Sequence, residues 1–133
     1  HTAPVNMNFG MREALRLLAD EGLDMAWARH RTNAEALWSG LESMGIEMHV
    51  PEELRLPTLT TVRIPEDVDG KAFTQHLLNN HGIEVGGGLG VLAGKIWRIG
   101  LMGYNSNPEN VSRLLNLFET ELPQFRQNVA VAA

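Results

Sequence analysis

The sequence predicts a single α+β domain in which helices pack on one face of a small, mostly antiparallel sheet. Helical and β-branched segments follow one another in the order α-α-β-β-α-β-β-α, and short loops join the neighbouring strands. With 133 residues, of which 44% are hydrophobic, the chain is long enough to bury one core. We assign residues 1–122 to this domain and residues 123–133 to a C-terminal tail.

Apolar periodicity and end signals define the predicted helices. They cover residues 11–22, 23–44, 69–82 and 107–122. Gly22 and Gly45 are stop signals for the first two helices. Asp69 fits the N-cap of the third, and Asn107 followed by Pro108 begins the fourth.

The predicted strands cover residues 46–50, 58–64, 83–85 and 96–101. Residues 58–64 alternate and are rich in β-branched side chains, so they form the clearest strand, which Pro65 ends. No internal repeat or interdomain linker interrupts the pattern.

The composition excludes several classes of function. The net charge is -5 and no basic patch is present, which argues against a nucleic-acid partner. No apolar run approaches the roughly 20 residues that a membrane span needs. The chain has no cysteine, which excludes disulfides and fits the reducing cytoplasm, where we expect the protein. Because residues 1–4 resemble no signal peptide and include no methionine, we expect the chain to start within a longer protein.

The glycines from Gly86 to Gly90 follow a predicted strand and suggest a phosphate-binding loop. Residues 88–93 match the pattern G-x-G-x-x-A, but a dinucleotide-binding loop must open a helix, and here another strand follows. The Gly-Lys pair at residues 94–95 is not a P-loop, because Ile96 stands where Ser or Thr is needed. We therefore expect a tight turn with positive φ, or a close approach of backbone to a neighbour such as a ligand.

Arg98 lies inside an apolar strand, and the flanking Trp97 and Ile99 point to the opposite face. Because the guanidinium keeps its charge, it needs water or an anion. A structural ion pair with one of the 16 acidic residues and a bound carboxylate both satisfy it. The residues alone favour the ion pair, because such pairs are common.

The histidines and tryptophans are interpreted as structural. His30 lies on an apolar helix stripe and is read as a satisfied core residue. His76 and His81 lie five apart, which is not the spacing of one helix face, and no set of His, Asp and Glu has a recognisable ligand geometry. We therefore predict no metal-binding residue. Trp27 and Trp38 are assigned to the core or to an interface.

Two long segments closely resemble the alanine–glyoxylate and serine–pyruvate aminotransferase family, within the class V, fold-type-I pyridoxal-phosphate enzymes. One is residues 54–62, Leu-Arg-Leu-Pro-Thr-Leu-Thr-Thr-Val. The other is residues 83–103, which hold the glycine cluster and an Arg-Ile-Gly-Leu motif. The resemblance runs from His1 to about Leu122 and implies the C-terminal small domain of such an enzyme.

The resemblance implies roles for two residues. The family's arginine in the Arg-Ile-Gly-Leu motif binds the substrate α-carboxylate, and here it is Arg98. A threonine in the family's His-Thr-x-Pro segment reaches across a homodimer to the cofactor phosphate, and Thr2 matches it, although the tyrosine before that segment is missing. The family's Schiff-base lysine lies upstream of His1, and Lys71 and Lys95 do not occupy its position, so we expect no catalytic residue in this chain.

The resulting prediction is one domain of an aminotransferase that moves an amino group from alanine or serine to glyoxylate or pyruvate. Its cofactor would be pyridoxal 5′-phosphate, and its partners these small amino and keto acids, its own large N-terminal domain and a second subunit. The fragment alone is predicted to be inactive. Two alternatives stay open: an inert folding or interaction module, and another class V enzyme such as a phosphoserine aminotransferase or a desulfurase.

Overall fold

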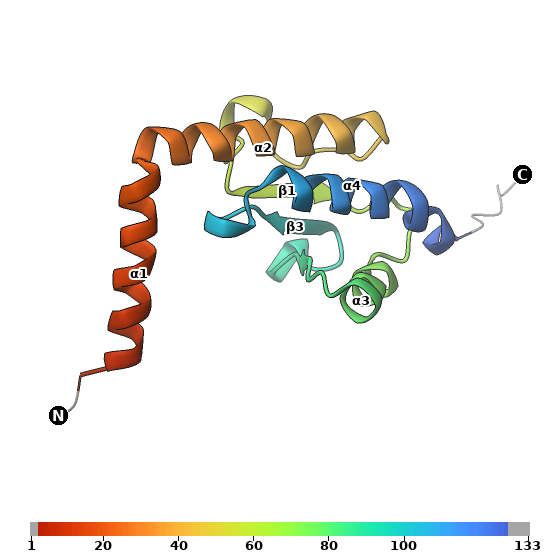
Figure 1. Cartoon of the computed structure of the whole chain (residues 1–133). Helices are drawn as coiled ribbons and strands as arrows, with labels where there is room; N and C mark the ends of the chain where they lie inside the picture. Colours follow the sequence, from red (N-terminus) through yellow and green to blue (C-terminus); the bar gives the residue numbers. More distant parts are fainter. Residues whose placement is uncertain (1–2, 128–133) are drawn as a thin grey trace, which may run out of the picture.

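Four α-helices and a three-stranded sheet make up the computed structural model, which describes residues 3–127 (Figure 1). The helices are α1 (Val5–Glu21), α2 (Leu23–Ser43), α3 (Gly70–His81) and α4 (Pro108–Glu121). The strands are β1 (Leu59–Arg63), β2 (Gly86–Gly87) and β3 (Ile96–Gly100). Their order is β1-β3-β2 and both pairs are antiparallel, so the predicted fold class is confirmed.

The predicted helix caps are present. The Asp69 side chain accepts a hydrogen bond from the Ala72 amide at 2.9 Å, and Asn107 accepts one from the Asn110 amide at 2.8 Å. Each cap satisfies one of the backbone N–H groups that a helix leaves free at its start. Helix α1 begins at Val5, earlier than the apolar pattern predicts. Among the described residues, no helix is long and apolar enough to cross a bilayer.

Two of the predicted strands differ in the structure. Residues 46–50 make a single bridge, Met48 to Val62, instead of a strand. The reason is that Pro51 follows at once and leaves no amide to continue the ladder. Residues 83–85 lie before the sheet, because the Ile83 amide still bonds to the Leu77 carbonyl at the end of α3. Strand pairing starts only at β2.

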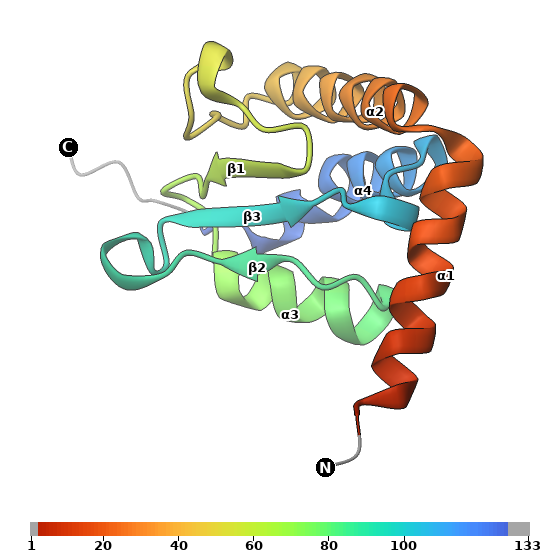
Figure 2. The ribbon, with the colours of Figure 1, turned by 90° about the vertical axis from the view of Figure 1, so that its left-hand side faces the viewer.

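The core lies on one face of the sheet (Figure 2). Figure 2 looks onto the strands, with α4 behind them and α2 and α3 above and below. Trp97 of β3 is buried, and its ring lies 5.5 Å from those of Phe73 in α3 and Phe118 in α4. Burying each such ring contributes about 1.5–3 kcal/mol. The aromatic contacts therefore join sheet and helices.

Beyond α4 the chain continues against α3. Residues Leu122–Phe125 form a 3-10 helix, in which the Phe125 ring lies 5.4 Å from Phe73. The Phe125 carbonyl accepts a hydrogen bond from the Asp69 amide at 2.9 Å. The end of α4 near Pro123 is as expected, whereas the division of the chain at residue 122 stays a prediction.

Helix α1 stands apart from this packing. It meets α2 at a corner and runs away from it (Figures 1 and 2). Gly22 forms the corner with a φ of 85°, and no side chain of α1 is buried. The corner is held by Glu21, whose carboxylate pairs with Arg29 at 2.5 Å. This pairing lowers the pKa of Glu21 below its usual value of 4.5.

Candidate functional site

Arg98 lies at the centre of the sheet face opposite the core. In the strand register it stands opposite Thr61 of β1 and Gly86 of β2. Residues opposite one another in a sheet share a face, so these three positions form one row across the strands. The neighbouring Trp97 and Ile99 are buried on the other face, as the sequence predicts.

The guanidinium of Arg98 is anchored but has no acid partner. Its Nε donates a hydrogen bond to the Gly87 carbonyl at 2.7 Å. All 16 acidic residues lie within residues 3–127, and none forms an ion pair with Arg98. The ion pair that the residues alone favoured is therefore wrong. The half-buried cation keeps its other donors for an anion.

Glycine at position 86 leaves room for this side chain. A Cβ atom there would lie 3.4 Å from Arg98 Nη2 and 3.5 Å from the Arg98 carbonyl oxygen. These are the short end of ordinary van der Waals distances, so the backbone at Gly86 lies directly beside the Arg98 side chain. Gly86 therefore borders the site, which a sequence pattern of glycines could not distinguish from turn formation.

The rest of the glycine cluster forms the tight turn that the sequence predicts. A Cβ at Gly88 would lie 2.0 Å from the Leu92 carbonyl oxygen, and Gly90 has a φ of 56°. Only a three-residue 3-10 helix, Gly90–Leu92, follows the glycines. The loop therefore lacks the helix that a dinucleotide-binding loop opens.

Thr61 is a site residue that the sequence reasoning missed. Its Oγ1 is buried and has no hydrogen-bond partner among the described residues. Unpartnered buried hydroxyls are rare in folded proteins, so each one calls for a reason. Its neighbour Thr60, on the core face, accepts a hydrogen bond from Trp38 Nε1 at 2.7 Å. An alternating strand pattern gives no sign of which threonine is satisfied.

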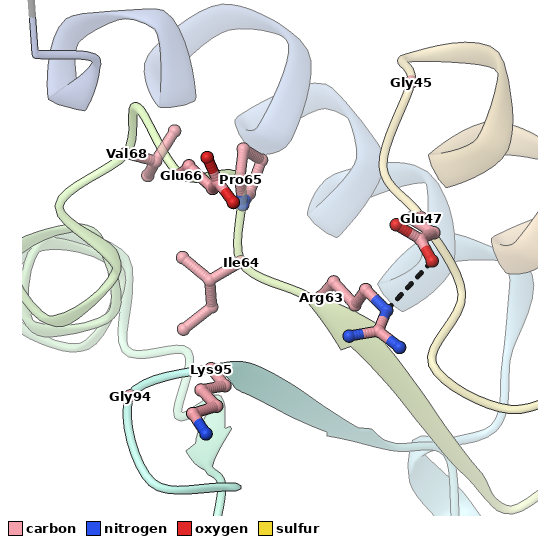
Figure 3. A pocket seen from close by; sticks show the side chains of 9 residues that line it. All are labelled: Gly45, Glu47, Arg63, Ile64, Pro65, Glu66, Val68, Gly94 and Lys95. Carbon is pink, nitrogen blue, oxygen red and sulfur yellow. Dashed lines mark ion pairs between the residues drawn. The ribbon is translucent and has the colours of Figure 1, made fainter. Parts of the chain in front are cut away.

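A polar pocket of about 730 Å³ lies elsewhere, beside the end of β1 (Figure 3). Figure 3 shows Arg63 paired with Glu47, at 2.9 Å, and Lys95 on the opposite wall. Glu66 also lines the pocket, so its charges are of both signs. A pocket that is open and mixed in charge selects no particular ligand, whereas Arg98 presents a single unpaired cation. We therefore place the candidate site at Arg98.

Comparison with known proteins identifies the relatives of the chain. The (S)-ureidoglycine–glyoxylate transaminase of Bacillus subtilis (strain 168) is 39% identical over 133 residues, 100% of this chain. The alanine–glyoxylate aminotransferase of Oryctolagus cuniculus is 40% identical over 129 residues, 96% of this chain. Over nearly its whole length, the chain is homologous to part of these aminotransferases. It spans about a third of these relatives, 32% and 33% of their lengths.

Solved structures of the aminotransferase family share the fold. The alanine–glyoxylate aminotransferase from Nostoc sp. matches with a TM-score of 0.86 and 60% identity, over 90% of this chain and 32% of that one. The ureidoglycine–glyoxylate aminotransferase from Bacillus subtilis matches with a TM-score of 0.90 and 37% identity, over 99% of this chain and 34% of that one. No model of a known protein family matches the chain.

Three further residues from the sequence analysis are Thr2, Lys71 and Lys95. Thr2 lies outside the described residues, so its contact with a cofactor phosphate stays a prediction. Lys71 and Lys95 are both exposed. A lysine activated for covalent catalysis is desolvated, which neither of these is.

His30 is hydrogen-bonded on both sides of its ring, as expected. Its Nδ1 lies 2.6 Å from the Ala26 carbonyl oxygen, and its Nε2 accepts from the Gly103 amide at 3.0 Å. Trp38 is buried, as a core residue would be, whereas Trp27 is 64% exposed.

The prediction that His76 and His81 lie on different faces is wrong. Both Nε2 atoms approach one carboxylate oxygen, Oε2 of Glu121. The reason is that His81 is the last residue of α3, where the backbone turns at Gly82, and the carboxylate comes from the end of α4. Spacing along an ideal helix does not describe such an arrangement.

Proposed function

We propose that the chain is the C-terminal small domain of a pyridoxal-phosphate-dependent aminotransferase and that Arg98 binds the α-carboxylate of the substrate. The relatives that it resembles are transaminases that act with glyoxylate, according to their names. The whole protein would move an amino group from alanine or serine to glyoxylate or pyruvate. Within the cytoplasm it would act as a homodimer, with Thr2 at the cofactor phosphate of the second subunit.

The observation that supports this proposal is the unpaired guanidinium of Arg98. The Gly87 carbonyl holds Nε at 2.7 Å, and among residues 3–127 no acid neutralises the charge. Two parallel N–H groups remain that match the two oxygens of a carboxylate. The donors are held before the substrate arrives, so little rotamer entropy is lost on binding.

In the reaction, Arg98 positions the substrate. A bidentate guanidinium–carboxylate pair fixes the α-carbon relative to the sheet and neutralises the carboxylate. When bound, pyridoxal phosphate supplies the electron sink that makes the α-proton acidic. The groups that move that proton would lie in the larger part of the enzyme, so this chain alone would not catalyse the transfer.

The test is Arg98→Ala in the whole enzyme. Losing a charged hydrogen-bonding group costs about 1.5–3 kcal/mol, so the KM for the amino acid should rise roughly 10- to 100-fold. The affinity for the cofactor should stay unchanged. Arg63→Ala is the matched control, because Arg63 is an exposed arginine of the adjacent strand that already pairs with Glu47. A KM that does not change in Arg98→Ala would refute the role.

The apolar surface of α1 and α2 supports a covering partner within the same enzyme. Phe9 and Trp27 are each 64% exposed, and Leu15, Leu18 and Trp27 line a pocket of about 530 Å³ between the two helices. Exposed apolar surface of this kind marks an interface. We assign it to contacts with the large domain or with the second subunit.

The second candidate is an inert interaction module, which the same exposed surface favours. A native mass measurement on the isolated chain tests whether that surface is an interface in either case. Concentration-dependent self-association is expected if the surface is an uncovered interface. A monomer at high concentration would argue against a sticky face and against the docking assignment.

The identity of the amino donor needs its own test, because the relatives are named for different amino donors. One is named for ureidoglycine and another for alanine. A screen of alanine, serine and ureidoglycine with glyoxylate, using the whole enzyme, decides among them. Turnover with ureidoglycine alone would overturn the alanine or serine assignment and leave the Arg98 role intact.

A further inference from the structure

We propose that His76, His81 and Glu121 form a binding site for a divalent transition-metal ion of the zinc type. The three residues join the end of α3 to the end of α4. They lie on the helix side of the sheet, whereas Arg98 lies on the opposite face. The Arg98 proposal makes no use of them.

The donor atoms already converge. The Nε2 atoms of both histidines and a Glu121 carboxylate oxygen lie within 4.8 Å of one another, and His81 Nε2 is 3.0 Å from Oε2. Zinc binds imidazole nitrogen and carboxylate oxygen at about 2.0–2.2 Å, which separates tetrahedral ligands by roughly 3.3–3.5 Å. Rotations of these side chains that shorten the widest of the separations, which is at most 4.8 Å, would bring the three atoms to such a geometry.

The charge and burial of the cluster suit a cation. Two neutral imidazoles and one carboxylate carry a charge of minus one, and the three side chains are only 19–26% exposed. A half-buried site with three protein ligands leaves a further coordination position for water.

Asn80 and Phe125 contact the ring of His76. Asn80 Nδ2 lies 3.0 Å from His76 Nδ1, and the Phe125 ring lies 5.1 Å from the His76 ring. In the Nε2–H tautomer of His76, the ring donates to Glu121 and its Nδ1 accepts from Asn80. With metal on Nε2, the proton sits on Nδ1, and a flip of the Asn80 amide turns its oxygen to accept it. Arg113, the nearby cation, is turned to the His81 carbonyl oxygen at 2.7 Å.

Spacing along one helix gives no sign of this metal site. His76 and His81 are five residues apart, and Glu121 follows 40 residues after His81. Only the packing of α4 against the end of α3 brings the third ligand in. The site would act as a cross-link that holds these two helix ends together.

The first experiment titrates ZnCl₂ into the 133-residue chain after dialysis against EDTA, with calorimetry for affinity and native mass spectrometry for stoichiometry. We expect one zinc ion per chain and a higher Tm with zinc. His76→Gln, His81→Gln and Glu121→Gln should each weaken binding at least about tenfold. Glu119→Gln, an exposed acid of α4, and His49→Gln are matched controls and should bind as the parent does. Far-UV circular dichroism confirms that each variant is folded.

The second experiment replaces zinc by Co²⁺, whose visible spectrum reports its ligands. The spectrum should be lost in His76→Gln, and Asn80→Leu should weaken binding about 10-fold without removing it. His1→Gln tests whether the N-terminal histidine takes the ion instead. The absence of saturable zinc uptake, or equal uptake by the double variant His76→Gln/His81→Gln, would overturn the proposal.

Discussion

The two faces of β3 show how one strand serves stability on one side and binding on the other. On the core face Trp97 is buried against Phe73 and Phe118, with its Nε1 donating to the Gly70 carbonyl at 3.2 Å. On the other face Arg98 is half-buried and lacks an acid partner among the described residues. On the core face, the buried indole N–H of Trp97 has a hydrogen-bond acceptor. On the opposite face, which we call the open face, the charge of Arg98 is left for a ligand to neutralise. Local incompleteness of this kind points to function.

The largest effect is expected on the core face, from Phe73→Ala. Phe73 is fully buried and contacts Trp97, Phe118 and Phe125, so its removal leaves a cavity among rings. The free energy of unfolding should fall by about 3–5 kcal/mol. Urea denaturation measures it. Arg98→Ala is the comparison and should cost less than about 1 kcal/mol. Equal losses in both variants would mean that Arg98 serves the fold.

Two adjacent threonines of β1 sharpen the comparison. Thr60→Val leaves the indole N–H of Trp38 buried without its acceptor, so we expect a loss of about 1–3 kcal/mol. Thr61→Val replaces a buried hydroxyl that has no partner among the described residues, so it should be neutral or stabilising. Thermal unfolding of both variants makes the comparison. A larger loss for Thr61→Val would show that its hydroxyl is satisfied in solution.

Gly86→Ala tests whether substrate binding by Arg98 depends on the small size of the residue beside it. The added Cβ would come into van der Waals contact with Arg98 Nη2 at 3.4 Å and fill space beside the guanidinium, so the KM for the amino acid should rise by no more than about 2-fold in the whole enzyme. Gly87→Ala is the control, because its Cβ would meet no atom within 4 Å. Steady-state kinetics of the two variants measures the difference. Equal KM values would show that the guanidinium moves aside freely.

The smallest expected effect on stability concerns Arg29, whose guanidinium, unlike that of Arg98, already has an acidic partner within the chain. It pairs with Glu21 and donates to the Ser106 carbonyl oxygen at 2.6 Å. Because Arg29 lowers the pKa of Glu21 below 4.5, the stabilisation is present above pH 4.5 and lost as pH falls through the lowered value. The stability difference between the parent and Glu21→Gln should shrink over that range. Glu119→Gln, an exposed acid, should show no such change. A difference independent of pH would disprove the linkage.

The sequence predicts well the features that local residues decide. The caps at Asp69 and Asn107 and the turn at Gly90 depend on residues a few positions apart, and all are found. The family and the general fold also follow from the sequence, because long segments match in register. The interior-facing positions of β3 follow from its alternation.

Features that depend on distant partners could not be predicted in this way. Whether residues 46–50 form a strand depends on how many of them pair with β1. Met48 alone forms a bridge, to Val62. Any of the 16 acids could have paired with Arg98, and periodicity does not show where they lie. His76 and His81 meet because Glu121 arrives from another helix.

The unburied α1 divides the chain into parts that should lose structure separately. Its backbone amides are shielded only by the helix itself, so they should exchange with solvent deuterium by local fraying, at free energies far below that of global unfolding. Because Trp27 is already 64% exposed, the change in tryptophan fluorescence on unfolding comes mainly from the buried Trp38 and Trp97, whereas circular dichroism also includes the 17 residues of α1. The two probes should therefore give melting curves that do not coincide, and a two-state fit of the ellipticity would understate the cooperativity of the core.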